Sequence, residues 1–157
     1  MSVYFAMERY MRRKNTTTEM MMGYMCSALL ELMLEKDYAK ISIGEIAKKA
    51  GVDRSSYYRH FKSKEDIISF FFDMVLKESL DGFTNLSSID FTLYIHSIYM
   101  AFYNYKKEVL LIYHSNLSSL LLDVLSKRFQ FSEIAIEFPL TKQYELSYII
   151  GGIYNNL

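Results

Sequence analysis

Six polar side chains within a short stretch of the sequence form the group best suited to do chemistry. They are Arg54, Ser55, Ser56, Tyr58, His60 and Lys64. Each carries a hydrogen-bond donor, and none is a carboxylate. Donors at this density suit the phosphates and base edges of a nucleic acid.

Catalytic chemistry is not expected anywhere in the chain. The three histidines, His60, His96 and His114, are far apart and lack metal-ligand spacing. No glycine-rich phosphate loop, nucleophile elbow or carboxylate pair is present. The single cysteine, Cys26, excludes an internal disulfide and suits a small buried position. We therefore predict no enzyme, no catalytic residue, no metal and no cofactor.

Two closely spaced helices must position the donor group. Ser42, followed three residues later by Glu45, has the pattern of a capping box that starts a helix. Gly51 ends that helix, and Asp53 is expected to cap the next one. A helix, a glycine turn and a second short helix from Arg54 to about Phe61 predict a helix-turn-helix.

Further helices follow from the spacing of apolar residues. One is expected before the pair, from the threonines at 16–18 to about Glu35, and another after it, from Lys64 to Leu80, with Ser63 as cap. Later helices are predicted at 91–105, from Glu108 to about Tyr113, at 117–129 and at 142–157, with an extended connection at 131–138. Pro and Gly are scarce and 51% of residues are hydrophobic, which favours an all-α fold with a substantial core.

The net charge of zero conceals an uneven distribution. Residues 1–64 hold 12 Lys and Arg against 7 Asp and Glu, whereas residues 65–157 hold 6 against 11. The net charges are thus +5 and −5. A basic head on an acidic body is expected when only the head meets a polyanion. No apolar run is long enough to span a membrane, so we expect no membrane contact and a cytoplasmic location.

The start of the second short helix is the place from which side chains reach bases in the major groove. Arg54 can present a forked donor to guanine, and Ser55 and Ser56 can meet bases or phosphates. Tyr58 and His60 suit phosphate oxygens. Lys64 adds a cation beside the free amides that open the following helix. Singly, each of these residues is more often only a cap or a solvated side chain, but their combination in this frame favours DNA. Tyr57 and Phe61 are expected to pack inward.

The chain resembles the TetR/AcrR family of bacterial transcriptional regulators over about residues 16–70. The matching residues are Ile46, Ala47, Ala50, Gly51, Val52, Tyr58, Phe61, Lys64 and Glu65, after a helix ending in Leu29, Leu30, Glu31 and Leu32. The resemblance implies a TetR-like all-α homodimer. A three-helix DNA-binding head at 1–63 would be joined by a long helix to a helical ligand-binding and dimerisation body at 64–157.

By position, the resemblance implies DNA contacts from Ser42, Arg54, Ser55, Ser56, Tyr58, His60 and Lys64. Gly44 departs from the family pattern, because relatives often place a DNA-contacting side chain there. Asp53 departs as well, since a smaller polar cap is more usual. The partner is expected to be double-stranded DNA with a palindromic operator, read by two helices about one DNA turn, or roughly 34 Å, apart.

The body is expected to hold an effector whose binding releases a repressor from DNA. Seven residues are candidates to line a pocket for a small apolar or aromatic molecule: Tyr94, His96, Tyr99, Phe102, Tyr103, Tyr113 and His114. Ordinary core packing is an equally good interpretation for most of them. After Glu145 the chain has no charged residue, so its last helix either docks into the core or continues beyond residue 157. Gly151 and Gly152 would allow close helix approach at a dimer seam.

A different class of function stays open. The chain is alternatively a helical protein-interaction module, or a regulator that senses a protein partner instead of a small ligand.

Overall fold

The structure is a computed structural model that describes residues 17–80, 91–130 and 140–156. Within these ranges every regular element is helical, which confirms the all-α prediction. The elements are α2 (Thr17–Glu35), the 3-10 turn η1 (Tyr38–Lys40), α3 (Ile43–Ala50), α4 (Arg54–His60), α5 (Lys64–Leu80), α6 (Phe91–Asn104), α7 (Lys106–His114), α8 (Ser119–Gln130) and α10 (Leu140–Asn156).

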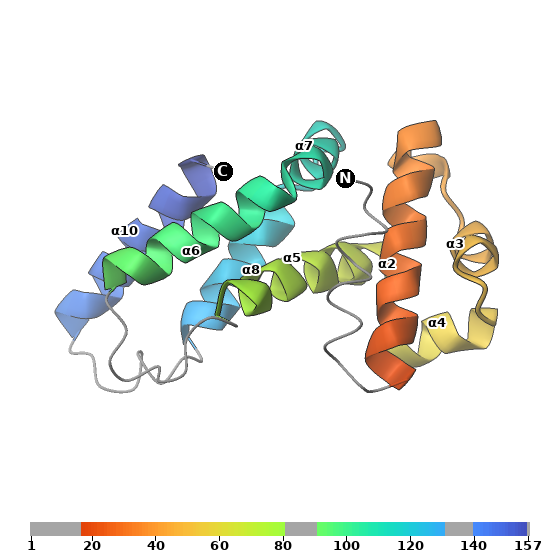
Figure 1. Cartoon of the computed structure of the whole chain (residues 1–157), viewed down its shortest axis with the longest axis horizontal. Coiled ribbons are helices and arrows are strands. Elements are labelled where there is room, and N and C mark those ends of the chain that lie inside the picture. Colours follow the sequence, from red (N-terminus) through yellow and green to blue (C-terminus); the bar gives the residue numbers. More distant parts are fainter. Residues whose placement is uncertain (1–16, 81–90, 131–139, 157) are drawn as a thin grey trace.

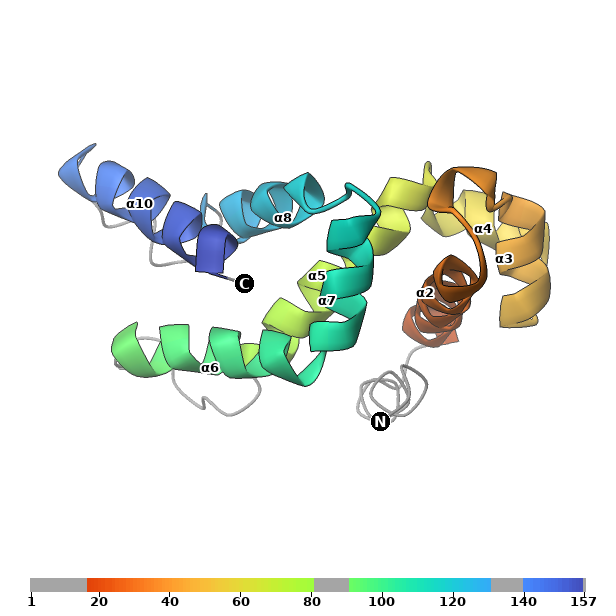
Figure 2. The ribbon, with the colours of Figure 1, turned by 90° about the horizontal axis from the view of Figure 1, so that it is seen from above.

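The helices gather at two ends of an elongated molecule. Figure 1 shows α2, α3 and α4 together at one end and α6, α8 and α10 at the other, with α5 running between them. Figure 2, the view from above, shows α7 following the end of α6 and leading on to α8. Helix α7 packs on α2 and α6. Helix α5 packs on α2 as well as on α6 and α8. It is thus one of the elements that join the two ends, together with α7.

The start and end of α3 follow the sequence prediction. Ser42 caps the helix: its hydroxyl accepts a hydrogen bond from the Glu45 amide at 3.3 Å, and its own amide donates to the Glu45 carboxylate at 2.9 Å. Gly51 ends α3 with φ at +68°, in the left-handed region that a residue with a Cβ adopts only under strain. The predicted capping box and glycine stop are confirmed.

The predicted side-chain cap at Asp53 is wrong in its bonding. Asp53 does occupy the N-cap position of α4, but its carboxylate makes no capping hydrogen bond. The amide of Ser56 instead donates to the backbone oxygen of Asp53, at 2.9 Å. The backbone of the tight turn therefore satisfies the Ser56 amide. At α5, by contrast, Ser63 and Asp66 form the expected reciprocal cap, with both bonds at 3.2 Å.

Aromatic side chains on α5 join the two ends of the molecule. Phe70 lies edge-on to Phe61 at the end of α4, with ring centroids 6.1 Å apart. Phe71 and Phe72 turn the other way, toward Tyr105 and Phe102, at 5.7 and 6.2 Å. One continuous hydrophobic cluster consequently runs from α2 to α10. Cys26 lies inside it, and burial raises the pKa of its thiol, as expected for an inert residue.

The helix boundaries agree closely with the predictions, with one notable shift. Helix α7 begins at Lys106, earlier than the predicted Glu108, because the Val109 amide already bonds to the Tyr105 carbonyl at 3.0 Å. The predicted connection at 131–138 lies outside the described residues.

Candidate nucleic-acid interface

Helix α4 is anchored by one aromatic side and exposes a polar one. Tyr57 is fully buried and Phe61 is 3% exposed, which confirms that both pack inward. Tyr57 contacts Phe61 and stands edge-on to Tyr58, with centroids 6.0 and 5.2 Å apart. Burying this pair fixes the rotation of the short helix about its axis. Arg54, Ser55 and Tyr58 consequently face outward.

Arg54 and Tyr58 form a pair along the exposed side of α4. The guanidinium Nη2 donates to the Tyr58 hydroxyl at 3.2 Å, and the guanidinium carbon lies 5.7 Å from the centre of the Tyr58 ring. Residues four apart are neighbours on a helix, so this contact follows from the spacing. It holds a forked cation near the N-terminal end of α4, where base contacts arise in helix-turn-helix proteins.

The remaining predicted DNA contacts are less exposed or already bonded. Ser56 and His60 are half-buried. The Nε2 atom of His60 is shielded from solvent and has no hydrogen-bond partner in the described part of the chain. A contact from His60 to phosphate would therefore use Nδ1 or require the ring to turn. Ser42 is exposed, but its hydroxyl already bonds to Glu45 at the start of α3.

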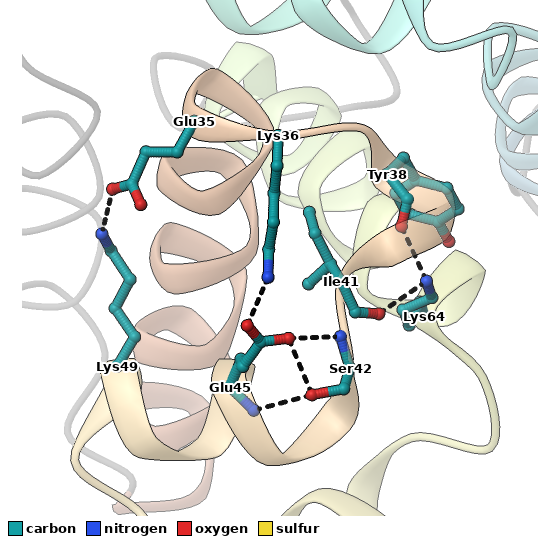
Figure 3. A network of polar contacts seen from close by, with 8 residues as sticks. All are labelled: Glu35, Lys36, Tyr38, Ile41, Ser42, Glu45, Lys49 and Lys64. Carbon is teal, nitrogen blue, oxygen red and sulfur yellow. Dashed lines mark hydrogen bonds and ion pairs between the residues drawn. The ribbon is translucent and has the colours of Figure 1, made fainter.

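Several lysines of the basic head are engaged in ion pairs. Lys36 bonds to the carboxylate of Glu45, and Lys49 meets Glu35 at 2.9 Å and Glu31 at 3.3 Å. Figure 3 shows the bonds from Lys36 to Glu45 and from Lys49 to Glu35, which fasten α3 to α2. The bond to Lys36, followed by the bonds to Ser42, lowers the pKa of Glu45 to about 2. These lysines hold the head together, so their charge is partly neutralised before any DNA arrives.

Three other cations face solvent. Lys48, Arg59 and Lys62 are exposed and have no side-chain partner among the residues described. Arg59 shares the outer side of α4 with Ser55, one turn earlier, so the helical spacing of the sequence contains a signal for it. Sequence reasoning missed all three because charge alone does not separate a paired lysine from a free one.

Lys64 has a different environment from these exposed cations. Its ammonium donates to the carbonyls of Tyr38 and Ile41, at 2.8 and 2.9 Å, and lies 4.3 Å from the centre of the Tyr38 ring. All three contacts reach back across the fold to the turn that precedes α3, as Figure 3 shows. The Lys64 ammonium, which was predicted to contact a phosphate, thus already has three contacts inside the protein.

The seven candidate effector residues are dispersed in the body. Tyr94 and Phe102 are buried, Tyr99 is half-buried, and His96, Tyr103, Tyr113 and His114 are exposed. Of the seven, Tyr113 alone lines one cavity that the described residues form. That cavity, of about 470 Å³, is lined by Phe72, Val109, Leu110, Ile112, Tyr113, Ser118, Leu121, Tyr154 and Asn155.

The cavity has an apolar floor and a rim with hydroxyl groups. Phe72, Ile112 and Leu121 are buried, whereas Leu110 and Tyr113 are exposed at the rim. The Tyr154 hydroxyl donates to Ser118 at 3.3 Å, and none of the described lining residues is charged. Because Phe72 belongs to α5, one wall of the cavity is built by the helix that reaches the head.

Metal-binding clusters and membrane-spanning helices are both absent from the residues described. Residues 17–80, 91–130 and 140–156 contain no group of three or more His, Cys, Asp or Glu able to hold a metal ion. In the same ranges no helix has both the length and the apolar character needed to cross a membrane.

Comparison with known proteins assigns the N-terminal part of the chain. Residues 26–69 match the family of bacterial regulatory proteins, tetR family. The HTH-type transcriptional regulator EthR of Mycolicibacterium smegmatis is 37% identical over 54 residues, which are 34% of this chain and 25% of that protein. The uncharacterized HTH-type transcriptional regulator YxbF of Bacillus subtilis is 34% identical over 62 residues, 39% of this chain and 16% of the relative.

These matches cover at most a quarter of either relative, and no solved structure matches the chain significantly. The matched segment nevertheless contains the capping box, the glycine turn and the whole of α4. Residues 26–69 therefore carry the sequence pattern of the tetR family of bacterial regulatory proteins.

Proposed function

We propose that this protein is a sequence-specific DNA-binding regulator that places α4 in the major groove. The observation that carries the proposal is the outer side of α4, where the Arg54 and Tyr58 pair stands over a fully buried Tyr57. Residues 1–63 form the DNA-binding domain in this proposal, and residues 64–157 form the ligand-binding and dimerisation domain.

The candidate polar and cationic side chains of the head have the following proposed roles. Arg54 reads a guanine, and Ser55 and Ser56 meet bases or phosphates. Tyr58 and His60 contact phosphates, as does Ser42 at the start of α3. Lys48, Arg59 and Lys62 add charge toward the DNA backbone, because they are exposed cations without a side-chain partner among the described residues.

The decisive experiment selects bound fragments from mixed genomic DNA and measures their affinity against salt concentration. A DNA reader should enrich a palindromic sequence, and its affinity should fall steeply with salt as counterions are released. The absence of binding at low salt would contradict the proposal and favour a protein-interaction module.

The cavity supports a proposal that a small ligand releases the protein from DNA. Its uncharged lining suits an apolar or aromatic molecule with one hydrogen-bonding group, which Ser118 and Tyr154 would meet. A ligand that favours one placement of α5 over another would shift the population of DNA-binding heads. The protein would then act as a repressor released by its effector.

Nile red, an uncharged apolar dye, can test the cavity. We expect its fluorescence to rise on binding, and Leu121→Trp to abolish the rise by filling the floor. Met100→Trp is the control, since Met100 is exposed and does not line the cavity. Equal loss in both variants, or unchanged fluorescence in Leu121→Trp, would contradict a ligand site here.

We also propose a homodimer formed through α8 and α10. These helices pack together and still leave Leu122 and Tyr148 exposed, the latter by 84%. A Cβ built on Gly151 or Gly152 meets nothing within 4 Å, so a second helix has room to approach. Sedimentation equilibrium of the wild type and of Tyr148→Glu checks this proposal: the wild type should have twice the mass of one chain, and the variant should dissociate.

A further inference from the structure

The first turn of α5 holds the turn that leads into α3. Lys64 bonds to the carbonyls of Tyr38 and Ile41, and the next residue, Glu65, accepts a hydrogen bond from the Tyr38 hydroxyl at 2.8 Å. We call these four residues the α5 clamp. Its two halves are separated by more than twenty residues of sequence, so it is a tertiary contact and not part of a helix cap.

The clamp occupies most of the bonding capacity of the Lys64 ammonium. An ammonium has three donors, and two of them point to carbonyls while the charge lies 4.3 Å from the Tyr38 ring. The third donor alone stays available to a phosphate, and a contact that used more than this donor would require these bonds to break. The two carbonyls would then lose their charged donor, at a site that is already half-buried.

The position of the clamp determines what it controls. Ile41 is 2% exposed and directly precedes Ser42, the N-cap of α3. A donor on the Ile41 carbonyl therefore fixes the residue from which α3 starts. Since α3 turns directly into α4 at Gly51, the same contact helps to set where α4 stands relative to α5.

We propose that Lys64 is a positioning residue that holds the start of α3 against α5, and that it does not contact a DNA phosphate. This inference rests on the proposed DNA-binding function. It also gives a physical route from the cavity to the head: α5 carries Phe72 in the cavity wall and, in its first turn, the clamp. Movement of α5 would displace Tyr38 and Ile41, the residues of the turn that precedes α3.

The test compares Lys64→Met, which removes the donors but keeps a long side chain, with Lys62→Met, a matched removal of charge on an exposed neighbour. For Lys64→Met we expect the Kd for selected DNA to rise about tenfold while the salt slope stays that of the wild type. For Lys62→Met we expect a salt slope shallower by about 0.9, the value for one phosphate that the protein no longer neutralises. Lys64→Arg, which keeps donors for both carbonyls, should restore most of the affinity.

Amide hydrogen exchange supplies a second readout that does not require DNA. Lys64→Met should lose protection at the start of α3, around Ile46, while amides in the middle of α2 stay protected. Tyr38→Phe removes only the bond to Glu65 and should show a smaller loss at the same place. It keeps the test usable if Lys64→Met does not fold.

The possible results test the positioning role of Lys64 separately from the proposed DNA-binding function. A shallower salt slope in Lys64→Met with unchanged exchange would identify a phosphate contact and overturn the inference, and so would unchanged affinity. If the wild type binds no DNA, the proposed function fails but exchange still decides the clamp. Local loss of protection at α3 would then support it, and unchanged protection would overturn it.

Discussion

Replacing Arg54 by alanine is the sharpest test of how α4 is oriented on DNA. Arg54 is exposed, and its hydrogen bond among the described residues is to the neutral hydroxyl of Tyr58, at 3.2 Å. Its removal should therefore change the free energy of unfolding by no more than about 0.5 kcal/mol. Any larger effect on DNA binding must come from the interface itself.

The expected effect on base preference follows from the chemistry of the guanidinium. A forked contact to guanine contributes about 1–3 kcal/mol of discrimination at one base pair, which is about 5- to 140-fold in the ratio of Kd values. In the free protein Tyr58 holds the guanidinium along the helix, so the bond to Tyr58 must be kept or exchanged when DNA binds. The net value of the bond from Arg54 to Tyr58, about 0.5–1.5 kcal/mol, is smaller than the upper part of the range of about 1–3 kcal/mol given for base discrimination.

The assay is competitive binding of operator variants, each changed at one base pair in both half-sites, to three proteins. Arg54→Ala should lose preference at a single pair of symmetric positions. Arg54→Lys should keep the salt slope but lose the same preference, because lysine lacks the fork. Arg59→Ala is the matched control on the same helix and should weaken all sequences alike.

Two results would refute this reasoning. If Arg54→Ala retains the base preference of the wild type, Arg54 is not a base reader. If Arg59→Ala instead relaxes the preference, α4 enters the groove by its C-terminal end, opposite to the orientation inferred from the exposed pair.

Three further predictions concern the stability of the head. Tyr57→Phe should raise the free energy of unfolding, by up to about 1 kcal/mol, because the buried Tyr57 hydroxyl has no partner among the described residues; chemical denaturation checks this, and destabilisation would reveal a bond that the structure does not show. Gly51→Ala should destabilise by about 1–2 kcal/mol because φ is +68°, whereas Gly44→Ala, where an added Cβ has room, should stabilise by up to about 1 kcal/mol; the same sign for both in chemical denaturation would contradict the backbone argument. The pKa of Glu45 is lowered from 4.5 to about 2 in the folded protein, so its ionised carboxylate contributes fully to the free energy of unfolding above pH 4.5, and this contribution is lost as the pH falls toward 2. The difference in the free energy of unfolding between wild type and Glu45→Gln should therefore shrink over that interval. A constant difference would show that ionisation of Glu45 does not affect stability.

Local sequence signals predicted the helices well because the residues that start and stop them act over three or four positions. The Ser42 and Glu45 box and the left-handed Gly51 are of this kind, and the structure contains both. Asp53 shows the limit of the approach. A residue with a capping side chain stands at the N-cap, but its carboxylate makes no capping hydrogen bond, and the Ser56 amide donates to the backbone oxygen of Asp53 instead.

The candidate site was predictable in outline and less so in detail. Helical spacing around Tyr57 and Phe61 was enough to place Arg54, Ser55 and Tyr58 on the outer side of α4. The same spacing could not show that Lys64 bonds to carbonyls of a turn 23 and 26 residues earlier in the chain. It also grouped seven aromatic and histidine side chains as one pocket, of which Tyr113 alone lines the cavity.

The sequence by itself therefore determined the helix-turn-helix, its polar outer side and its resemblance to the tetR family over residues 26–69. Caps, glycine turns and periodic apolar residues encode these features locally. Tertiary structure alone decided which of the described cations are bonded and which face solvent, and which side chains share a cavity. The physical reason is that these properties depend on the packing of α3 against α2 and of α5 against α2, α6 and α8, which brings together residues far apart in the chain.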